Sequence, residues 1–449
     1  MHRSFLGVAA LLGLLMAVFG GPAERAAQEP PLLVMISLDG LRPDYITEAG
    51  AHGVKAPNLR RFIAEGSYAD GTRGVVPTVT YPSHTTLVTG VWPAKHGILA
   101  NTTFDPLDKN QQGWYWYAED IRVPTLWDRA AAAGRTTASV QWPATVGARI
   151  TWNIPEFWRA NTADDAKLLR AVATPGLLEE GAKALGEYRG DTAIEGDRTR
   201  GRYVEWILEN KHPSLLTLHL SSLDHTEHET GPFSKESVAV LEELDAIVGR
   251  IRVTAERVAP GRAFLAVVSD HGFVATEMQL DIFPAFRDAQ LFSVDSKNKI
   301  TDWKAMPWVT GGSAAIVLKD PSDSLTLGKV RELLGKLAAD PANGIDRVLE
   351  ADELHKQGGY PTASFFVSLK PGWRTGRELD QPLILKTKPG GTHGAMPDLP
   401  ELRASFFLIG PGVPAGRDLG IIDMRDVAPT LARAVGLSMP SAEGKNLLP

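Results

Sequence analysis

Three apolar runs in the sequence each end at an aspartate. They are residues 32–38 before Asp39, residues 215–223 before Asp224 and residues 264–269 before Asp270. Uninterrupted apolar runs of this length are typical of parallel strands that are buried on both faces, and ligand-binding residues lie at the carboxyl ends of such strands. We therefore expect the three carboxylates to meet at one edge of a buried sheet.

Histidines stand close to two of these aspartates. His228 is four residues after Asp224, and His271 directly follows Asp270. A further histidine, His393, lies in a glycine-flanked loop. Cysteine is absent, so thiolate ligands and disulfides are excluded, and any metal must be held by Asp, His or hydroxyl groups. The pattern predicts a two-metal hydrolase site.

The composition is that of a large globular protein. With 449 residues, 43% of them hydrophobic and 22% charged, the chain can bury a sizeable core. The net charge of -6 arises from 47 basic and 53 acidic residues, and neither sign forms a long run. The sequence therefore shows no cluster of basic residues of the kind that binds polymeric nucleic acid. We expect a small substrate and no nucleic-acid polymer as a partner.

The N-terminal segment has the pattern of a secretory signal. A charged start precedes an apolar stretch at residues 5–19, which is followed by small residues and a polar segment. This stretch is shorter than the roughly 20 residues that a transmembrane helix needs. We expect a signal peptide at residues 1–27, a secreted or periplasmic mature protein, and no stable membrane span after cleavage. An uncleaved anchor is the alternative.

Strand-like and helix-like segments alternate from residue 32 to about residue 269. This order predicts an α/β fold, with a central, mostly parallel sheet covered by helices on both faces. Helices are expected at residues 57–65, 125–133, 200–210 and 235–257.

The pattern loosens between about residues 275 and 385, which we interpret as an inserted small subdomain. It contains a strand-like run at residues 314–318 and an amphipathic stretch at residues 327–338. The core pattern resumes with a strand at residues 406–409 and ends in a helix near residues 424–435.

The candidate nucleophile lies in a segment rich in hydroxyl groups, residues 75–84. Pro82 suits the first turn of a helix, which would place Thr80 just ahead of free backbone N–H groups that can hold an anion. Coordination to a metal would lower the pKa of a threonine hydroxyl and activate it without a histidine base. From the residues alone, Thr78 competes with Thr80 almost evenly and Ser83 competes weakly.

These segments resemble the nucleotide pyrophosphatase/phosphodiesterase family of the alkaline phosphatase superfamily, the type I phosphodiesterases, over nearly the whole mature sequence. The matching motifs are LDGLRPDY at residues 38–45, PTVTYPSH at 77–84, LVTGVWPAKHGI at 87–98, DHTEHETGP at 224–232, SDHG at 269–272 and GTHG at 391–394. The resemblance implies an alkaline-phosphatase-like catalytic domain at residues 28–449. Ser83 replaces the usual asparagine of the family, and Phe273 stands where methionine is more common; neither is a ligand position.

The resemblance also implies the roles of individual residues. One zinc ion would be bound by Asp39, Asp270, His271 and the hydroxyl of Thr80. The other would be bound by Asp224, His228 and His393. Thr80 would be the nucleophile, and Asn101 matches the asparagine that hydrogen-bonds a phosphate oxygen. Manganese and iron are the alternatives to two Zn²⁺ ions per chain.

Other histidines near the motifs have simpler explanations. We expect His84 and His96 to satisfy backbone groups and orient loops. His225 neighbours Asp224, but the i, i+4 pair of Asp224 and His228 suits one metal better than adjacent residues do.

The substrate class depends on the absence of certain cations. Monoesterases of this superfamily meet the extra charge of a monoester with a Lys-x-Arg pair or an added arginine. The corresponding stretch here, residues 139–145, has no basic residue, although Arg149 is nearby. Its Trp-Pro sequence resembles the diesterase branch, in which an aromatic pocket receives the second ester group. Tyr81, Phe157 and Trp158 are candidates to stack on a nucleobase or contact a choline cation, and ordinary packing is the alternative for the last two.

We predict a secreted metal-dependent phosphodiesterase or pyrophosphatase that cleaves nucleotide-type or phosphocholine-type diesters through a phosphothreonine intermediate. Asn101 and the backbone N–H of Tyr81 would stabilise the equatorial phosphate oxygens. A phosphomonoesterase is the first alternative. A catalytically inactive zinc-binding protein is the second, although such a protein is expected to lose Thr80 or a metal ligand. A sulfatase is disfavoured, because the formylglycine motif is absent at the nucleophile.

Overall fold

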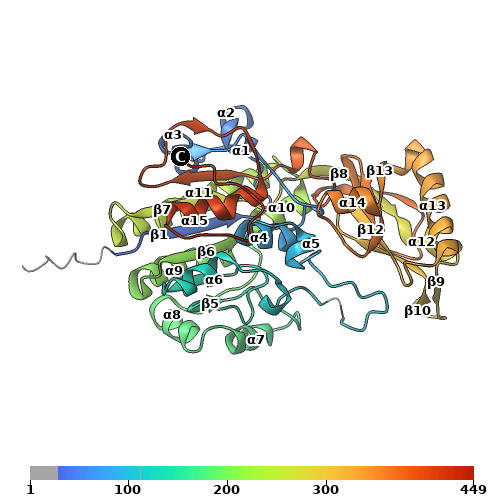
Figure 1. The fold of residues 1–449 in the computed structure, drawn as a ribbon, viewed down its shortest axis with the longest axis horizontal. Helices are drawn as coiled ribbons and strands as arrows, with labels where there is room; N and C mark the ends of the chain where they lie inside the picture. The colour runs from blue at the N-terminus through green and yellow to red at the C-terminus, as the bar shows by residue number, and fades with distance from the viewer. Residues whose placement is uncertain (1–28, 112) are drawn as a thin grey trace, which may run out of the picture. The chain divides into compact units, whose positions relative to one another are not determined.

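The three expected apolar strands lie in the middle of an eight-stranded sheet in the computed structural model, which describes residues 29–111 and 113–449 (Figure 1). The strand order is β18-β2-β17-β7-β1-β6-β4-β5. Five neighbouring strands are parallel: β7 (Ala263–Val268), β1 (Leu32–Leu38), β6 (Leu215–Leu220), β4 (Thr137–Val140) and β5 (Trp152–Ile154). The remaining strands are β17 (Phe406–Ile409), which is antiparallel to β7, β2 (Ser67–Tyr68) and β18 (Arg417–Asp418). The predicted α/β class with a mostly parallel central sheet is confirmed. The expected signal peptide lies outside the described residues.

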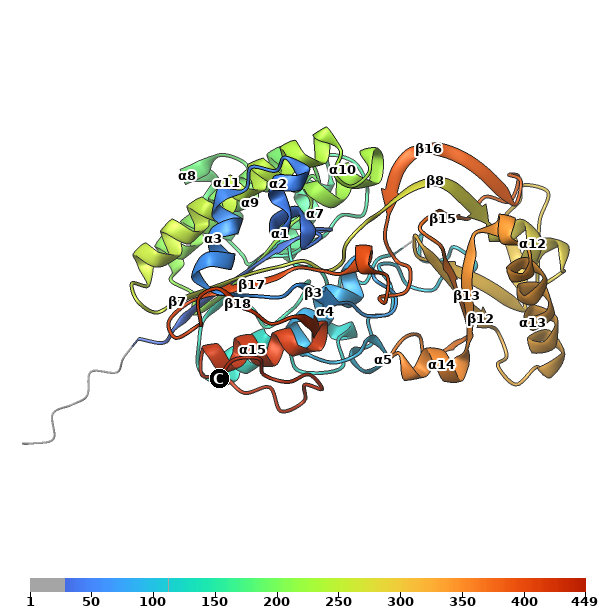
Figure 2. The same ribbon diagram turned by 90° about the horizontal axis from the view of Figure 1, so that it is seen from above.

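Helices cover both faces of this sheet (Figure 2). One face is covered by α3 (Pro57–Glu65), α8 (Leu177–Leu185), α9 (Ile194–Lys211) and α11 (Lys235–Val258). The other is covered by α4 (Thr80–Thr89), α6 (Leu126–Ala132) and α15 (Val427–Ala434). Side chains of β1 alternate between the two cores, with Ile36 in the first and Met35 in the second. A strand with apolar neighbours on both sides must read as an uninterrupted apolar run, as this one does.

The expected helices are present, and two of the boundaries that differ from the expectation bear on the site. The helix α9 begins at Ile194, six residues before the expected start at residue 200, because a buried ion pair supports its polar first turns. The apolar run that we extended to residue 223 is a strand only as far as Leu220. The residues after it form α10 (Ser222–Thr230), so Asp224 lies in the first turn of a helix.

The residues of the expected insert form a separate four-stranded antiparallel sheet, in the order β11-β12-β14-β13. These strands are β11 (Ala305–Val309), β12 (Ser313–Leu318), β14 (Ala363–Leu369) and β13 (Ile345–Glu350). Helices α12 (Ile282–Asp288) and α13 (Ser324–Ala339) share one apolar core with it, and α14 (Ala351–Lys356) contributes to a second. The boundaries of the subdomain stay a prediction.

Two long strands lead into and out of this region. They are β8 (Val274–Asp281) and β16 (Ile384–Thr392), which pair antiparallel and form a three-stranded sheet with β15 (Gly372–Gly376), in the order β15-β8-β16 (Figure 2). Val274 pairs with Thr392, so the loops just before β8 and just after β16 are brought together.

The other elements are short. They are α1 (Asp44–Thr47), α2 (Ala49–His52), β3 (Gly71–Arg73), α5 (Pro93–His96), α7 (Asp165–Val172), β9 (Phe292–Val294), β10 (Ile300–Trp303) and β19 (Ile421–Asp423). Among the described helices, none has both the length and the apolar character needed to cross a bilayer.

A buried ion pair joins α9 to the start of α10. The side chains of Arg200 and Asp197 are 1% and 0% exposed and are in direct contact. Arg200 Nη1 also donates to Ser221 Oγ at 2.8 Å, and its Nη2 donates to the carbonyl of Asp191 at 2.8 Å. Asp197 Oδ2 accepts from the backbone N–H of Ser222, the first residue of α10, at 2.9 Å. A carboxylate on α9 thus acts as the N-terminal cap of α10.

We expect Arg200→Met to destabilise the protein strongly, because the Asp197 carboxylate would stay buried without its countercharge. The free energy of unfolding in a urea titration should fall by about 3–5 kcal/mol. The double variant Asp197→Leu/Arg200→Met should recover part of the loss. Lys167→Met, which removes an exposed partner of Asp164, is the control and should change little. An Arg200→Met protein as stable as the wild type would contradict this account.

Candidate active site

The carboxyl ends of three adjacent parallel strands bring the predicted carboxylates together. Asp39 directly follows β1, Asp270 follows β7, and Asp224 lies in the first turn of α10 after β6. Asp39 and Asp270 are buried, and Asp224 is partly buried. The expected convergence at one edge of the sheet is therefore present.

The first group of candidate metal ligands consists of Asp39, Asp270 and His271. His271 Nε2 is 3.1 Å from Asp270 Oδ2 and 3.4 Å from Asp39 Oδ1. Candidate ligand atoms of all three residues lie within 4.8 Å of one another.

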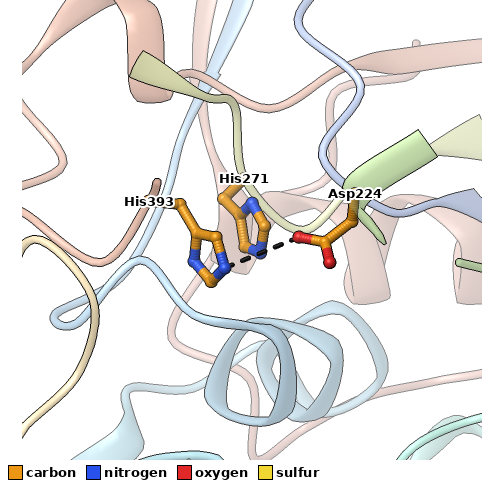
Figure 3. A group of neighbouring side chains, drawn as sticks. All are labelled: Asp224, His271 and His393. Carbon is orange, nitrogen blue, oxygen red and sulfur yellow. Dashed lines mark ion pairs between the residues drawn. The ribbon is translucent and has the colours of Figure 1, made fainter. Parts of the chain in front are cut away.

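The second group consists of Asp224, His271 and His393 (Figure 3). Asp224 Oδ1 is 3.5 Å from His393 Nε2 and 3.4 Å from His228 Nε2. The rings of His271 and His393 are stacked, with centroids 3.6 Å apart. His271, which we expected in one site, thus borders both, whereas His228 lies beside Asp224 but outside the tight group of three. Its role as a ligand stays a prediction.

The donor atoms in these groups suit a cation. Four buried atoms have no hydrogen-bond partner within the described part of the chain, namely Asp39 Oδ1, Asp224 Oδ1, Asp270 Oδ2 and His271 Nε2. Buried polar atoms are normally paired, so a set of unpaired atoms that converge needs an explanation. A divalent metal with Asp and His ligands supplies one.

The electrostatics of the site also favour added positive charge. Burial and the nearby charges of Asp270 and Asp224 raise the pKa of Asp39 well above its usual value. Burial alone would lower the pKa of His271, but Asp270 and the other carboxylates raise it to about 9. The carboxylates therefore repel one another and draw in positive charge, which bound metal ions would provide.

The histidines are oriented by backbone carbonyls. His393 Nδ1 lies 2.9 Å from the carbonyl of Thr78, and His228 Nδ1 lies 3.1 Å from the carbonyl of Gly391. Each Nδ1–H donates to its carbonyl, which leaves Nε2 with a lone pair that faces Asp224.

Thr80 is the first residue of α4 and lines the same cavity as the candidate ligands Asp39, Asp224 and His393. Asn101 Nδ2 lies 3.5 Å from Thr80 Oγ1, and Asn101 Oδ1 accepts from the backbone N–H of Tyr81 at 2.9 Å. The N–H of Tyr81 thus orients the Asn101 amide, and the Asn101 NH₂ group faces Thr80. The expected contact of the Tyr81 N–H with a phosphate oxygen stays a prediction.

The competing hydroxyl groups lie outside the cavity. Thr78 is fully buried, where its Oγ1 donates to the carbonyl of Ala395 at 2.9 Å and accepts from the N–H of Gly394 at 3.0 Å. Ser83 is fully buried on α4, and neither side chain lines the cavity. The geometry thus favours Thr80, a choice that the residues alone left open.

The additional histidines have the expected structural contacts. His84 Nδ1 donates to the carbonyl of Thr80 at 2.9 Å, and His96 Nδ1 accepts from the N–H of Ile98 at 3.1 Å. Burial lowers the pKa of both rings to about 3, which suits neutral imidazoles within a packed structure. His225 is half exposed and lies 3.9 Å from Glu229.

Two buried residues in the site were missed as functional partners. His219 Nε2 lies 2.9 Å from Asp39 Oδ2, and His219 Nδ1 lies 3.0 Å from Glu156 Oε2. His219 thereby fixes the orientation of a predicted metal ligand. The available signal was a histidine within the apolar run of β6, because a polar side chain in a buried strand needs partners.

A cavity of about 650 Å³ extends from the metal groups. Phe157 and Trp158 line it, as does Trp114, whose ring lies edge-on to Trp158. The expectation of a substrate contact for the Tyr81 ring is corrected, because that ring is fully buried and packs against Trp114 outside the cavity lining. Arg149 is exposed and does not line the cavity.

The family model for type I phosphodiesterase / nucleotide pyrophosphatase matches residues 33–396. The chain is 25% identical over 241 residues to the bis(5'-adenosyl)-triphosphatase ENPP4 of Pongo abelii, which covers 52% of this chain and 45% of that protein. It is 27% identical over 310 residues to ectonucleotide pyrophosphatase/phosphodiesterase family member 7 of Rattus norvegicus, which covers 66% of this chain and 63% of that protein. The chain thus spans about half the length of the ENPP4 relative.

A solved structure shares the fold. An inactive murine ectonucleotide pyrophosphatase/phosphodiesterase 5 in complex with AMP aligns with a TM-score of 0.64 and 20% identity, covering 93% of this chain and 97% of that one. The family model matches well over half of the sequence, and the solved relative has the same architecture. The chain belongs to the type I phosphodiesterase / nucleotide pyrophosphatase family.

Proposed function

We propose that this protein is an exported, metal-dependent hydrolase of phosphate diesters that uses Thr80 as its nucleophile. The observation that carries the proposal is the position of Thr80 at the start of α4, in one cavity with Asn101, with Asp39 of the first ligand group, and with Asp224 and His393 of the second. Export rests on the signal-like segment at residues 1–27.

The predicted site residues would have separate roles in metal binding, nucleophilic attack and phosphate binding. Asp39, Asp270, His271 and Thr80 would hold one zinc ion, and Asp224, His228 and His393 would hold the other. When bound, the metals would lower the pKa of the Thr80 hydroxyl and offset the negative charge of the phosphate. Thr80 Oγ1 would attack phosphorus in line with the leaving alcohol and form a phosphothreonine, which water then hydrolyses. The Asn101 NH₂ group would donate to an equatorial oxygen of the phosphate.

The cavity supports a diester as the substrate. Arg200 is the one lysine or arginine among its lining residues in the described chain, and its guanidinium is held by Asp197 and the surrounding backbone. No free cation of the described lining is thus left to meet the extra charge of a monoester. The aromatic side chains of Trp114, Phe157 and Trp158 offer an apolar wall for a second ester group. Hydrolysis of nucleotide-type or phosphocholine-type diesters fits this site.

Metal dependence is the first test of this proposal. Purified protein should contain close to two zinc-like ions per chain, chelation should abolish turnover, and added zinc should restore it. Asp39→Ala and Asp224→Ala should each lower the metal content by about one ion, because they remove ligands from different sites. Full activity in a strong chelator, with no transition metal found by elemental analysis, would contradict the proposal.

Replacement of the nucleophile is the second test. Thr80→Ala should retain the fold and the metals but lose at least about a thousandfold in kcat, because the covalent route is closed. Thr80→Ser should stay active. Ser83→Ala is the matched control on the same helix, and it should leave kcat near that of the wild type because Ser83 Oγ has no hydrogen-bond partner in the described structure. Wild-type activity in Thr80→Ala would exclude Thr80 as the nucleophile.

Substrate charge provides the third test. The wild type should prefer a nitrophenyl diester over 4-nitrophenyl phosphate by at least about tenfold in kcat/KM, since a charge-assisted contact that a monoester needs is missing. A preference for the monoester would identify a phosphomonoesterase instead.

A further inference from the structure

The cavity beside the metal groups has a polar floor, and the proposed reaction gives no substrate contact to its residues. Gln141 follows β4, and Glu156 lies two residues after β5. The two strands are paired, and the backbone N–H of Gln141 continues this pairing by donating to the carbonyl of Ile154 at 2.7 Å. Tyr188 and His219 also line this part of the cavity. The surrounding wall includes the apolar side chains of Trp114, Phe157, Trp158 and Leu169, together with polar residues such as Asp165 and Asp191. An apolar cavity with a few placed polar groups is the usual form of a site that recognises one polar feature of a ligand.

The backbone of Gln141 is held in a strained conformation. Its φ is 60°, in the left-handed region that a residue with a long side chain rarely adopts. The N–H bond to Ile154 fixes one side of the residue, and on the other side its carbonyl accepts from His219 Nδ1 at 3.2 Å. Strain of this kind persists where the surroundings impose it, commonly beside a bound ligand. It sets the direction in which the Gln141 side chain leaves the strand.

The Gln141 amide group has an unused donor. Gln141 is 4% exposed, and its Oε1 accepts from the Tyr188 hydroxyl at 2.9 Å. Its amide nitrogen has no hydrogen-bond partner among the residues that the structure describes, and Gln141 lines the cavity. The nitrogen is not among the fully buried unpaired atoms, so it is open to the cavity, and a ligand group there can accept a hydrogen bond from it.

Glu156 provides an acceptor in the same cavity. Glu156 Oε2 accepts from His219, whereas Glu156 Oε1 has only a 3.4 Å contact with the Tyr81 hydroxyl. His219 Nδ1 contacts both the Gln141 carbonyl and Glu156 Oε2, so the floor presents an amide donor and a carboxylate acceptor from two neighbouring residues. A hydroxyl group satisfies both, because it accepts from the amide and donates to the carboxylate. A quaternary ammonium group has neither an N–H nor a lone pair, and it would leave Gln141 unpaired.

We propose that Gln141, Glu156 and Tyr188 form a hydroxyl-recognition subsite, and that the ester group held in the cavity belongs to a hydroxylated alcohol of the sugar or glycerol class. This inference rests on the proposed diesterase function and narrows its substrate class. It selects against an ester group of the choline type.

The test compares three diesters that share 4-nitrophenol as the leaving group and carry ethanol, glycerol or choline as the other alcohol. With zinc-loaded wild-type protein, kcat/KM for the glycerol diester should exceed that for the other two by at least about tenfold, because a site built to bind a hydroxyl rejects analogues that lack it. Gln141→Met should lower the glycerol-to-ethyl ratio by about three- to tenfold. Tyr188→Phe should lower it in the same direction, because the Gln141 amide loses its anchor.

Tyr203→Phe is the matched control. Its hydroxyl donates to the carbonyl of Gly186 at 2.9 Å and lies outside the cavity lining, so the glycerol-to-ethyl ratio should stay unchanged. Thermal unfolding of each variant verifies that the fold is retained.

A binding measurement separates this inference from the proposed reaction. Calorimetric titration of the three diesters into zinc-loaded Thr80→Ala protein reports recognition without turnover, and the glycerol diester should bind with the lowest Kd. If the glycerol diester binds most tightly but the wild type does not hydrolyse any of the three diesters, the proposed reaction is contradicted and the hydroxyl-recognition subsite is supported. Equal Kd values, a preference for the choline diester, or a glycerol-to-ethyl ratio unchanged in folded Gln141→Met would overturn the subsite.

Discussion

The repulsion among three carboxylates at one edge of the sheet is the constraint on which the site depends. Asp39, Asp224 and Asp270 lie at the ends of adjacent parallel elements, and their mutual charge contributes to the raised pKa of Asp39. Buried charge of one sign is costly unless a countercharge is near. The unpaired oxygen atoms of these three residues, together with His271 Nε2, mark where that countercharge would be bound.

The fold supplies the parts of this arrangement from distant stretches of sequence. Parallel pairing of β1 with β6 and β7 sets the position of the carboxylates, while pairing of β8 with β16 brings the loop of His393 to the loop of His271. A buried ion pair between Asp197 and Arg200 holds the start of α10, which carries Asp224. Ligands, nucleophile and cavity therefore all depend on the same sheet.

Much of this could be predicted from the sequence, because buried parallel strands leave an uninterrupted apolar run that ends at a polar residue. The strand β1 and the convergence of Asp39 with Asp270 followed from that pattern. The start of α10 did not, because its cap comes from Asp197 on another helix and leaves no local signal. The prediction that the Tyr81 ring contacts substrate failed for a related reason. The sequence around an aromatic residue beside a nucleophile is the same whether its ring faces the substrate or packs against another residue such as Trp114. Contacts between residues far apart in sequence decide both cases.

The stereochemical course at phosphorus tests the central claim most directly. A covalent route through Thr80 consists of two in-line displacements, each of which inverts phosphorus. Hydrolysis of a chiral phosphorothioate diester by the zinc-loaded protein should therefore proceed with overall retention of configuration. Net inversion would show that water attacks the diester directly, and it would contradict the role of Thr80 as the nucleophile.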